Sequence, residues 1–276
     1  MDRYCVMGNP VEHSRSPWIH ARFAALTGQP VEYGRRLVPL AGFAAALQAF
    51  RAEGGRGCNV TVPFKFEAAT LVSHRSERAA LAGACNTLRF EAGGIYGDNT
   101  DGLGLVHDLQ DNAGVALAGR DVLLIGAGGA AAGVLGPLVE AKPRRIVVAN
   151  RTPEKAQALV ARHAMLADAT GVRLEACGLD AVPGAFDVVV NGTASSLSGA
   201  EVPVPASVLR PGALACDMMY GPAAEGFLQW ARAHGASGRD GLGMLVEQAA
   251  EAFLVWRGVR PPSAQVLAEL RQELAR

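Results

Sequence analysis

The segment 121–141, DVLLIGAGGAAAGVLGPLVEA, constrains the fold more than any other part of the chain. The apolar run 122–125 predicts a buried strand, the glycines Gly126, Gly128 and Gly129 predict a tight turn, and the alanine- and leucine-rich run behind them predicts a helix. Glycine suits such a turn because it tolerates positive φ and has no Cβ to keep a ligand off the backbone. The helix would point free N–H groups and the positive end of its dipole at the turn, which favours a bound phosphate.

The spacing of these glycines is a variant of the dinucleotide-binding fingerprint. The strict motif has its third glycine at position 131, where this chain has Ala131, and the alanine-ending form of the motif allows that residue. A strand, a glycine turn and a helix can also be plain architecture. The strand before the turn and the helix after it favour a nucleotide site.

The next apolar strand, residues 144–150, indicates which dinucleotide is bound. An NAD site has an acidic residue roughly 20 positions past the glycines, which bonds the ribose 2′-hydroxyl. Here Asn150, Arg151 and Thr152 follow instead. Arg151 offers a planar fork of donors to a 2′-phosphate, which favours NADP over NAD. The same residues also suit a helix start, with Thr152 as the cap and Pro153 in the first turn.

Composition limits the kind of protein. The chain has 276 residues, enough for two domains. Its 26 basic and 26 acidic side chains balance, so nucleic acid and anionic membranes are not expected as partners. The apolar runs are shorter than a membrane span, and the N-terminus does not have the layout of a signal peptide, so we expect a cytoplasmic protein.

The cysteines favour a reducing compartment. They are odd in number and scattered, with no CxxC pair, which predicts reduced thiols and neither a disulfide framework nor a zinc site. His13 and His20 flank a polar loop, but two histidines without a third ligand make a weak metal site, so no metal is expected. The cysteines are Cys5, Cys58, Cys85, Cys177 and Cys216.

Polar residues follow the first strands of the chain, where open α/β sheets place their ligands. Ser14 and Ser16 lie in the loop after the strand 4–7, and either a helix cap or a ligand contact explains them; a cap is the simpler interpretation. Lys65 follows the strand 57–62 in an apolar PFKF setting. It is either a ligand-site lysine or a solvated residue on a first helical turn.

The sequence GDNTDG (97–102) places two carboxylates, an amide and a hydroxyl between glycines. A turn can contain such residues but does not need so many of them, whereas a ligand-binding site needs several polar side chains. Asp101 is therefore a candidate site residue, and a helix is predicted over residues 103–112.

Together these motifs resemble the shikimate dehydrogenase family, which includes shikimate/quinate dehydrogenases. The resemblance covers almost the whole length and is specific in combination. One departure is Ala132, where the family often has an arginine; we expect this change to weaken a contact on the helix surface and to leave the phosphate turn intact. The motifs are GNPVEHSRSP (8–17), NVTVPFK (59–65), ERAALAGACNTL (77–88), GDNTDG (97–102), GAGGAAAG (126–133), NRTPEK (150–155), NGTASSLSG (191–199), DMMYGP (217–222) and DGLGMLVEQAA (240–250).

The resemblance implies roles for individual residues. Lys65 and Asp101 match the catalytic pair of the family, in which lysine supplies the proton and the carboxylate holds the lysine and the reacting hydroxyl. A structural ion pair is the alternative. The positions that match substrate contacts are Ser14, Ser16, Thr61, Lys65, Asn86, Asp101, Tyr220 and Gln248. The positions that match NADP contacts are Glu77, Gly126, Ala127, Gly128, Gly129, Ala130, Asn150, Arg151, Thr152, Pro153, Glu154, Lys155, Met218 and Gly241.

The expected fold is α/β, with two domains around a cleft. Residues 1–102 and 242–276 are expected to form the substrate domain, and residues 103–241 a Rossmann-type NADP-binding domain. The implied function is the NADPH-dependent reduction of 3-dehydroshikimate to shikimate by a monomer or homodimer. An NAD-preferring quinate/shikimate dehydrogenase and a non-catalytic NADP-binding regulator are the alternatives.

Overall fold

The computed structural model describes residues 1–193 and 201–275. The chain divides into two compact units, a first unit of Met1–Gly104 with Leu245–Arg276 and a second unit of Leu105–Met244. Each unit has its own sheet and its own buried apolar cluster, so the predicted two-domain α/β organisation is confirmed. The chain passes between the units inside helices α5 (Asp101–His107) and α9 (Leu242–Arg257).

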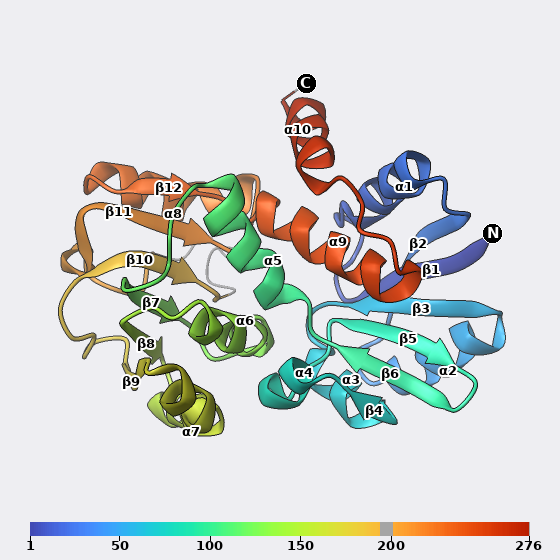
Figure 1. Cartoon of the computed structure of the whole chain (residues 1–276), viewed down its shortest axis with the longest axis horizontal. Helices are drawn as coiled ribbons and strands as arrows, with labels where there is room; N and C mark the ends of the chain where they lie inside the picture. The colour runs from blue at the N-terminus through green and yellow to red at the C-terminus, as the bar shows by residue number, and fades with distance from the viewer. Residues whose placement is uncertain (194–200, 276) are drawn as a thin grey trace. The chain divides into compact units, whose positions relative to one another are not determined.

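The first unit is built on a six-stranded mixed sheet in the order β2-β1-β3-β5-β6-β4 (Figure 1). Strands β2, β1 and β3, which begin this order at one edge, are parallel, so their carboxyl ends lie together, and β5 and β6 form an antiparallel hairpin. The strands are β1 (Asp2–Gly8), β2 (Val31–Leu37), β3 (Gly55–Val60), β4 (His74–Arg75), β5 (Thr87–Glu91) and β6 (Gly94–Asp98).

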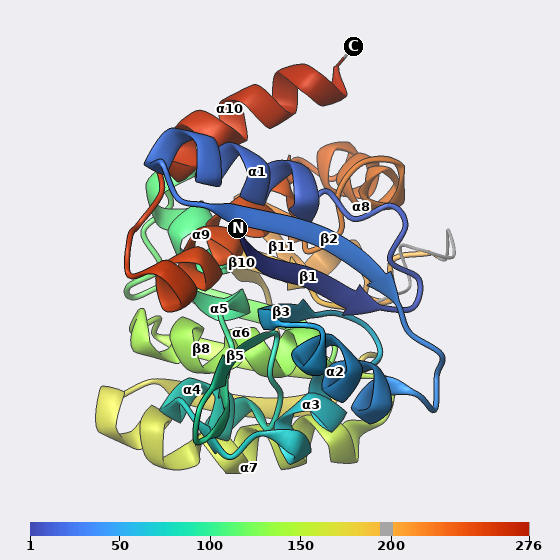
Figure 2. The same ribbon diagram turned by 90° about the vertical axis from the view of Figure 1, so that its right-hand side faces the viewer.

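Helices cover this sheet because each crossover between parallel strands returns over one face. Figure 2 shows α1 and α2 on opposite sides of the strands β1 and β2. The core beneath α2 contains Phe43, Leu47, Phe64 and Leu88, all of which are buried. The helices of this unit, besides α5 and α9, are α1 (Ser16–Thr27), α2 (Phe43–Ala52), α3 (Lys65–Leu71), α4 (Glu77–Ala82) and α10 (Ser263–Leu274).

The second unit has a six-stranded, wholly parallel sheet in the order β12-β11-β10-β7-β8-β9. Read from β9, this is the strand order of a Rossmann fold, with the topological switch between β7 and β10. The apolar run predicted from the sequence forms the fully buried β7 at its centre. The strands are β7 (Asp121–Ile125), β8 (Arg145–Asn150), β9 (Arg173–Gly178), β10 (Phe186–Asn191), β11 (Leu209–Asp217) and β12 (Ser237–Arg239).

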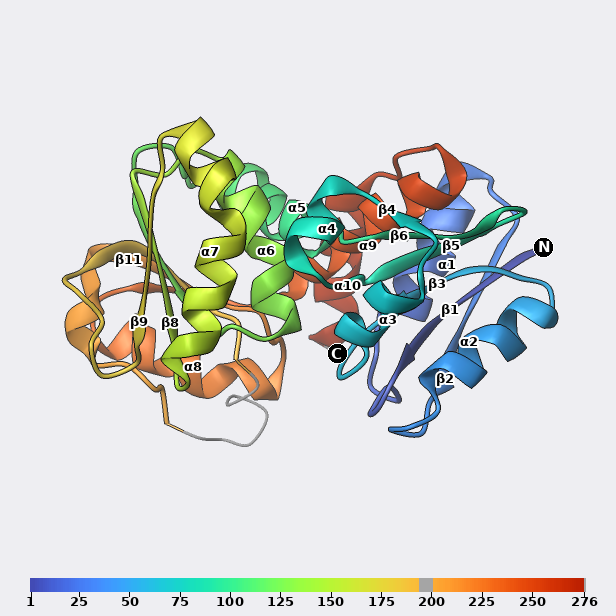
Figure 3. The ribbon, with the colours of Figure 1, turned by 90° about the horizontal axis from the view of Figure 1, so that it is seen from below.

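Helices α6 (Gly129–Glu140) and α7 (Pro153–Thr170) lie side by side against this sheet, as Figure 3 shows. Helix α8 (Pro222–Ala233) packs on β11 and β12. A 3-10 turn at Ala206–Val208 precedes β11. Buried residues of α7 recur three or four positions apart, which gives it one apolar face for the sheet.

The structure corrects the predicted helix over residues 103–112. Helix α5 ends at His107, and Asp108–Asn112 forms a π-helical turn, in which the Ala113 N–H donates to the Asp108 carbonyl oxygen at 2.9 Å. The Asp108 carboxylate is fully buried and receives two hydrogen bonds from Arg239. This buried pair holds the wider turn in place.

All five cysteines lie in the described part of the chain and are free thiols. Within residues 1–193 and 201–275, every helix is too short or too polar to cross a membrane.

Candidate active site

Lys65 and Asp101 form a short ion pair in the first unit. The Lys65 Nζ lies 2.6 Å from Asp101 Oδ2, and the two side chains are only 14% and 6% exposed. Lys65 is the first residue of α3, after β3, and Asp101 is the first residue of α5, after β6. Each stands where a strand has ended and a helix begins, at the positions singled out in the sequence. Limited solvent access makes this charge-assisted hydrogen bond stronger than a surface pair.

Asn86 connects this pair to helix α9. Its Nδ2 donates to Asp101 Oδ1 at 2.8 Å, to Thr100 Oγ1 at 2.9 Å and to Gln248 Oε1 at 3.3 Å. Asn86 is 2% exposed and Gln248 is 9% exposed. The structure thus brings together four of the predicted substrate residues: Lys65, Asn86, Asp101 and Gln248.

The other predicted substrate residues of this unit follow neighbouring parallel strands. Ser14 and Ser16 come after β1 and Thr61 after β3, and the Thr61 N–H donates to the Met7 carbonyl oxygen at 2.9 Å. A Cβ on Gly8 would lie 2.3 Å from the Thr61 methyl group, so only glycine permits this close approach of the strand ends.

The expectation that a serine caps α1 is wrong. Arg15 occupies the N-cap position, Ser16 is the first helical residue, and Ser14 Oγ accepts the Ser16 N–H at 3.3 Å. Arg35 donates two hydrogen bonds to the Ser14 carbonyl oxygen, which fixes the loop. Ser14 is half-buried in this loop after β1.

Several buried polar residues of this unit were missed by sequence reasoning. Asn59 accepts a hydrogen bond from the Tyr33 hydroxyl at 2.7 Å and donates to the Asn86 carbonyl oxygen and to Thr87 Oγ1. Thr100 donates its N–H to Asn86 Oδ1 at 2.8 Å. Asn59 belongs to the NVTVPFK motif and Thr100 to the GDNTDG motif. The polar residues gathered at the ends of these strands were the sequence feature that could have identified them.

The histidines do not form a metal site. His20 is fully buried and stacks on Tyr33, and burial lowers its pKa to about 3, so its ring is neutral at physiological pH. His13 is exposed. Among the described residues, no three His, Cys, Asp or Glu side chains gather as metal ligands would.

In the second unit, the glycine turn has the geometry that its residues predict. Gly126 has φ +110°, a conformation that side-chain-bearing residues rarely adopt, and a Cβ there would lie 3.1 Å from the Gly192 carbonyl oxygen. Gly128 is the N-cap of α6, and a Cβ built on it would meet no atom of the described residues within 4 Å beyond its two chain neighbours. The first turn of a helix leaves N–H groups without partners inside the helix. This bare backbone at a helix start fits a pyrophosphate.

Ala127 and Ala130 flank these glycines and are half-buried. Ala132 is the fourth residue of α6 and is 2% exposed, so this position is buried and does not form the expected contact on the helix surface.

The segment after β8 fits a 2′-phosphate. Arg151 and Thr152 are exposed, and Asn150 Nδ2 donates to the Thr152 carbonyl oxygen at 2.9 Å. Thr152 occupies the predicted N-cap position of α7, without a side-chain cap hydrogen bond, and Pro153 stands in the first turn as predicted. Glu154 and Lys155 are exposed on that turn. A helix N-terminus with an exposed guanidinium fork beside it is suited to an anion.

Two further predicted cofactor residues meet at the carboxyl end of β11. The Met218 N–H donates to the Asn191 carbonyl oxygen at 3.0 Å, and a Cβ on Gly241 would lie 2.2 Å from the Met218 carbonyl oxygen. Tyr220, predicted to contact substrate, is half-buried in the same loop of the second unit. Glu77 is exposed at the start of α4 in the first unit. Of the NGTASSLSG motif, residues 194–199 lie outside the described residues.

Comparison with known proteins places the chain in a family. Residues 6–88 match the model of the shikimate dehydrogenase substrate binding domain, residues 108–199 that of shikimate / quinate 5-dehydrogenase, and residues 241–271 that of the shikimate 5′-dehydrogenase C-terminal domain. The chain belongs to the shikimate dehydrogenase family.

Relatives within the family are close in sequence and in structure. The shikimate dehydrogenase (NADP(+)) of Acidovorax sp. is 70% identical over 99% of this chain and 97% of its own length. That of Methylibium petroleiphilum is 67% identical over 98% of this chain and 94% of its own. The crystal structure of shikimate 5-dehydrogenase from Thermus thermophilus with NADP(H) and shikimate has a TM-score of 0.83 at 32% identity, covering 99% of both chains.

Proposed function

We propose that this protein is an NADP-dependent shikimate dehydrogenase, which reversibly reduces 3-dehydroshikimate to shikimate on the route to chorismate and the aromatic amino acids. One observation carries the proposal. A half-buried lysine is held 2.6 Å from the Asp101 carboxylate by a polar network in a chain 70% identical to a relative of that name. Such a lysine and carboxylate are what reduction of a ring ketone requires of the protein.

The chemistry divides between cofactor and side chains. NADPH, when bound, supplies the hydride to the ring carbonyl carbon. Lys65 Nζ donates a proton to the carbonyl oxygen, which becomes the hydroxyl, and takes it back in the reverse direction. Asp101 holds the ammonium group by its hydrogen bond and accepts one from the same hydroxyl. Asn86 fixes the carboxylate through its second oxygen, which leaves Asp101 one orientation.

We assign substrate binding to residues 1–102 with 242–276. The half-buried and buried polar groups at the carboxyl ends of β1, β3 and β6 support this, because polyhydroxylated rings are bound by such donors and acceptors. Tyr220 is added from the second unit on the resemblance alone. The substrate residues are Ser14, Ser16, Thr61, Lys65, Asn86, Asp101, Tyr220 and Gln248.

We assign NADP binding to residues 103–241. The positive φ of Gly126, the lack of described atoms around a Cβ built on Gly128 and the exposed Arg151 support this assignment. Met218, Gly241 and, from the first unit, Glu77 are added on the resemblance. The remaining cofactor residues are Ala127, Gly129, Ala130, Asn150, Thr152, Pro153, Glu154 and Lys155.

Free thiols at all five cysteines support a cytoplasmic enzyme, since oxidising compartments favour disulfides. Its partners in this proposal are small molecules, with a monomer or a homodimer as the working form.

The test is an absorbance assay of purified protein that follows NADPH formation with shikimate and NADP, NADH formation with shikimate and NAD, and then both reactions with quinate in place of shikimate. We expect the fastest turnover with shikimate and NADP. Folded protein that binds NADP but oxidises neither substrate would instead indicate a regulator. Faster turnover of quinate with NAD would indicate the quinate/shikimate alternative.

A further inference from the structure

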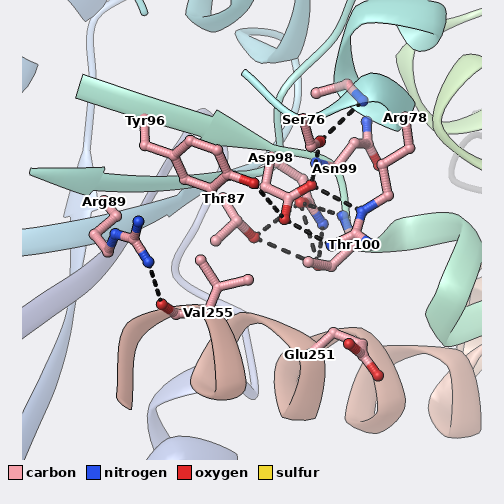
Figure 4. A network of polar contacts seen from close by, with 12 residues as sticks. Ser76, Arg78, Thr87, Arg89, Tyr96, Asp98, Asn99, Thr100, Glu251 and Val255 are labelled. Atoms are coloured by element: carbon pink, nitrogen blue, oxygen red, sulfur yellow. Dashed lines mark hydrogen bonds and ion pairs between the residues drawn. The ribbon is translucent and has the colours of Figure 1, made fainter. Parts of the chain in front are cut away.

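The Asp98 carboxylate is the most heavily bonded acidic group near the candidate active site (Figure 4). Its side chain is 1% exposed. Arg78 donates two parallel hydrogen bonds to this carboxylate, from Nε to Oδ1 at 2.8 Å and from Nη2 to Oδ2 at 2.6 Å. The Ser76 hydroxyl donates to Oδ1 at 2.5 Å, and the Asn99 N–H donates to Oδ1 at 2.7 Å. A buried carboxylate is tolerated only with partners of this quality.

Asp98 is connected to Asp101 through Asn99. Because the Asp98 carboxylate accepts the Asn99 N–H, it fixes the first peptide of the loop that leads from β6 to α5. Asn99 is fully buried, its Nδ2 donates to the Ala84 carbonyl oxygen at 2.9 Å, and its Oδ1 accepts the Asp101 N–H at 3.2 Å. The backbone of Asp101 is thereby tied to a side chain that Asp98 orients.

A second connection runs through Asn86. The Asn86 N–H donates to the Asp98 carbonyl oxygen at 3.0 Å, and the Asn86 amide donates to Asp101 Oδ1 at 2.8 Å. One residue, Asp98, therefore supports both the backbone and the side chain of Asp101. The carboxylate orientation that meets Lys65 is set by these two connections together.

Arg78 is the residue that makes Asp98 rigid. It comes from the first turn of α4, whereas Asp98 ends β6, so their planar bidentate contact locks a helix to a strand end. A lysine in its place would provide a point charge without the fork. Elsewhere in this unit, Arg36 makes a similar bidentate contact with Glu53. That carboxylate is 42% exposed, and Glu53 precedes the amino end of β3.

We propose that Arg78 and Asp98 are positioning residues for the reaction: they hold Asp101 in the orientation that keeps Lys65 aligned with the substrate. This inference rests on the proposed function, since it takes Lys65 and Asp101 as the catalytic pair. It assigns to the Arg78–Asp98 pair an effect on turnover in addition to any effect on stability.

The test is a double-mutant cycle on turnover with shikimate and NADP. Arg78→Lys should lower kcat by about 10-fold to 100-fold, because small misplacements of reacting groups have effects of this size. The Michaelis constant for NADP should stay unchanged, because the proposed nucleotide residues other than Glu77 lie on the other unit, and the substitution leaves the neighbouring Glu77 in place. In an Asp101→Asn background, Arg78→Lys should cause less than about a twofold further loss, since both residues act on one group.

Arg36→Lys is the matched control, because its side chain is 29% exposed, as that of Arg78 is, and it breaks a bidentate pair in the same unit. It should change kcat by less than about twofold, as expected for a surface ion pair. If Arg78→Lys does not fold, Ser76→Ala replaces it in the same cycle, since it removes another donor to Asp98.

The outcomes separate this inference from the proposed function. Normal kcat in folded Arg78→Lys, or an equal loss in the wild-type and Asp101→Asn backgrounds, overturns the positioning role. The same holds for normal kcat in Ser76→Ala where that variant is used. Failure of the wild-type protein to oxidise shikimate, or normal kcat in Lys65→Ala, instead refutes the proposed function itself.

Discussion

The surroundings of Lys65 determine whether this side chain is solvated or takes part in a buried ion pair. A lysine on a first helical turn is most often solvated, yet here it is 14% exposed and paired to Asp101. If it is the acid/base group, Lys65→Ala should lower kcat by about 10² or more, the range typical of general acid–base catalysis. NADP affinity should remain near normal, because Lys65 lies outside the nucleotide-binding unit. Titration of NADP by fluorescence beside turnover measures both quantities.

Asp101→Asn distinguishes a catalytic pair from a structural one. The amide still bonds a hydroxyl but does not hold the lysine by charge, so turnover should fall, and the losses in the double mutant should not add. A purely structural ion pair predicts the opposite pattern, with lower melting temperatures and near-normal turnover in the folded fraction. Melting temperatures of both single mutants and the double mutant, measured beside kcat, decide between these two cases.

Arg151 is the side chain that should set cofactor preference. Arg151→Ala should raise the Michaelis constant for NADP far more than that for NAD, because a charge-assisted hydrogen bond to phosphate contributes about 1.5–3 kcal/mol. Arg162→Ala is the matched control, since Arg162 is exposed further along α7. Equal changes for NADP and NAD in Arg151→Ala would remove this residue from the 2′-phosphate site.

Some of these side chains were predictable and others were not. Lys65 was found because it follows a predicted strand in an apolar PFKF setting, and Asp101 because it lies in the polar segment GDNTDG. Gln248 was found only through the family resemblance, because it meets Asn86 across 162 positions of sequence and no local pattern reports such a contact. The pairing of Arg78 with Asp98 was missed. It joins the start of α4 to the end of β6, and the sequence does not show how the β5–β6 hairpin aligns these two positions.

Among the elements, long and strongly patterned ones were predictable. The run 122–125, the glycine turn and the helix behind it appear as β7, the turn at Gly126 and α6. The short strands β4 and β12, two and three residues long, were missed because they carry too few residues for an alternating pattern. The π-helical turn was missed as well, because the buried pair of Asp108 and Arg239 that holds it spans 131 positions.

The amino ends of β7, β10 and β11 are joined by a cluster of charged residues. Asp121 begins β7 and is 3% exposed at its side chain. Arg144 bonds both of its carboxylate oxygens, at 2.8 and 2.7 Å, and Arg210 bonds one at 2.7 Å. The hydrogen bonds from Arg144 lower the pKa of Asp121 below its usual 3.8, burial opposes this, and Arg210 lowers it further.

This lowered pKa predicts a pH dependence of stability. The folded state favours the charged carboxylate, so the stabilisation is complete above pH 3.8 and is lost as the pH falls through the lower folded pKa. Asp121→Asn should reduce the free energy of unfolding at neutral pH by about 1.5–3 kcal/mol, the range for hydrogen bonds to charged groups. The difference from wild type should shrink below about pH 4.

Urea unfolding of both proteins across this pH range measures the effect. Asp111→Asn is the control, since Asp111 is exposed in the same unit. A difference between Asp121→Asn and wild type that stays constant down to the lowest pH would show that the carboxylate's charge contributes nothing.

At the scale of the molecule, each of the two units has an apolar core built from its own described residues. One contains Leu88 and lies in the first unit, and the other contains Leu123 and lies in the second. Each core closes within its own unit, and two helices, α5 and α9, carry the chain across. We therefore expect calorimetry to resolve two unfolding transitions. Ligands stabilise the state they bind, so NADP should raise the second unit's transition and shikimate the first unit's.

Matched core substitutions assign the transitions independently of the ligands. Leu88 and Leu123 are both fully buried, so Leu88→Ala and Leu123→Ala should each destabilise one unit by about 2–5 kcal/mol. Leu88→Ala should lower only the transition that shikimate raises, and Leu123→Ala only the one that NADP raises. A single transition lowered by both substitutions and raised by either ligand would mean that the units unfold together, because the continuous helices α5 and α9 transmit the loss of one core to the other.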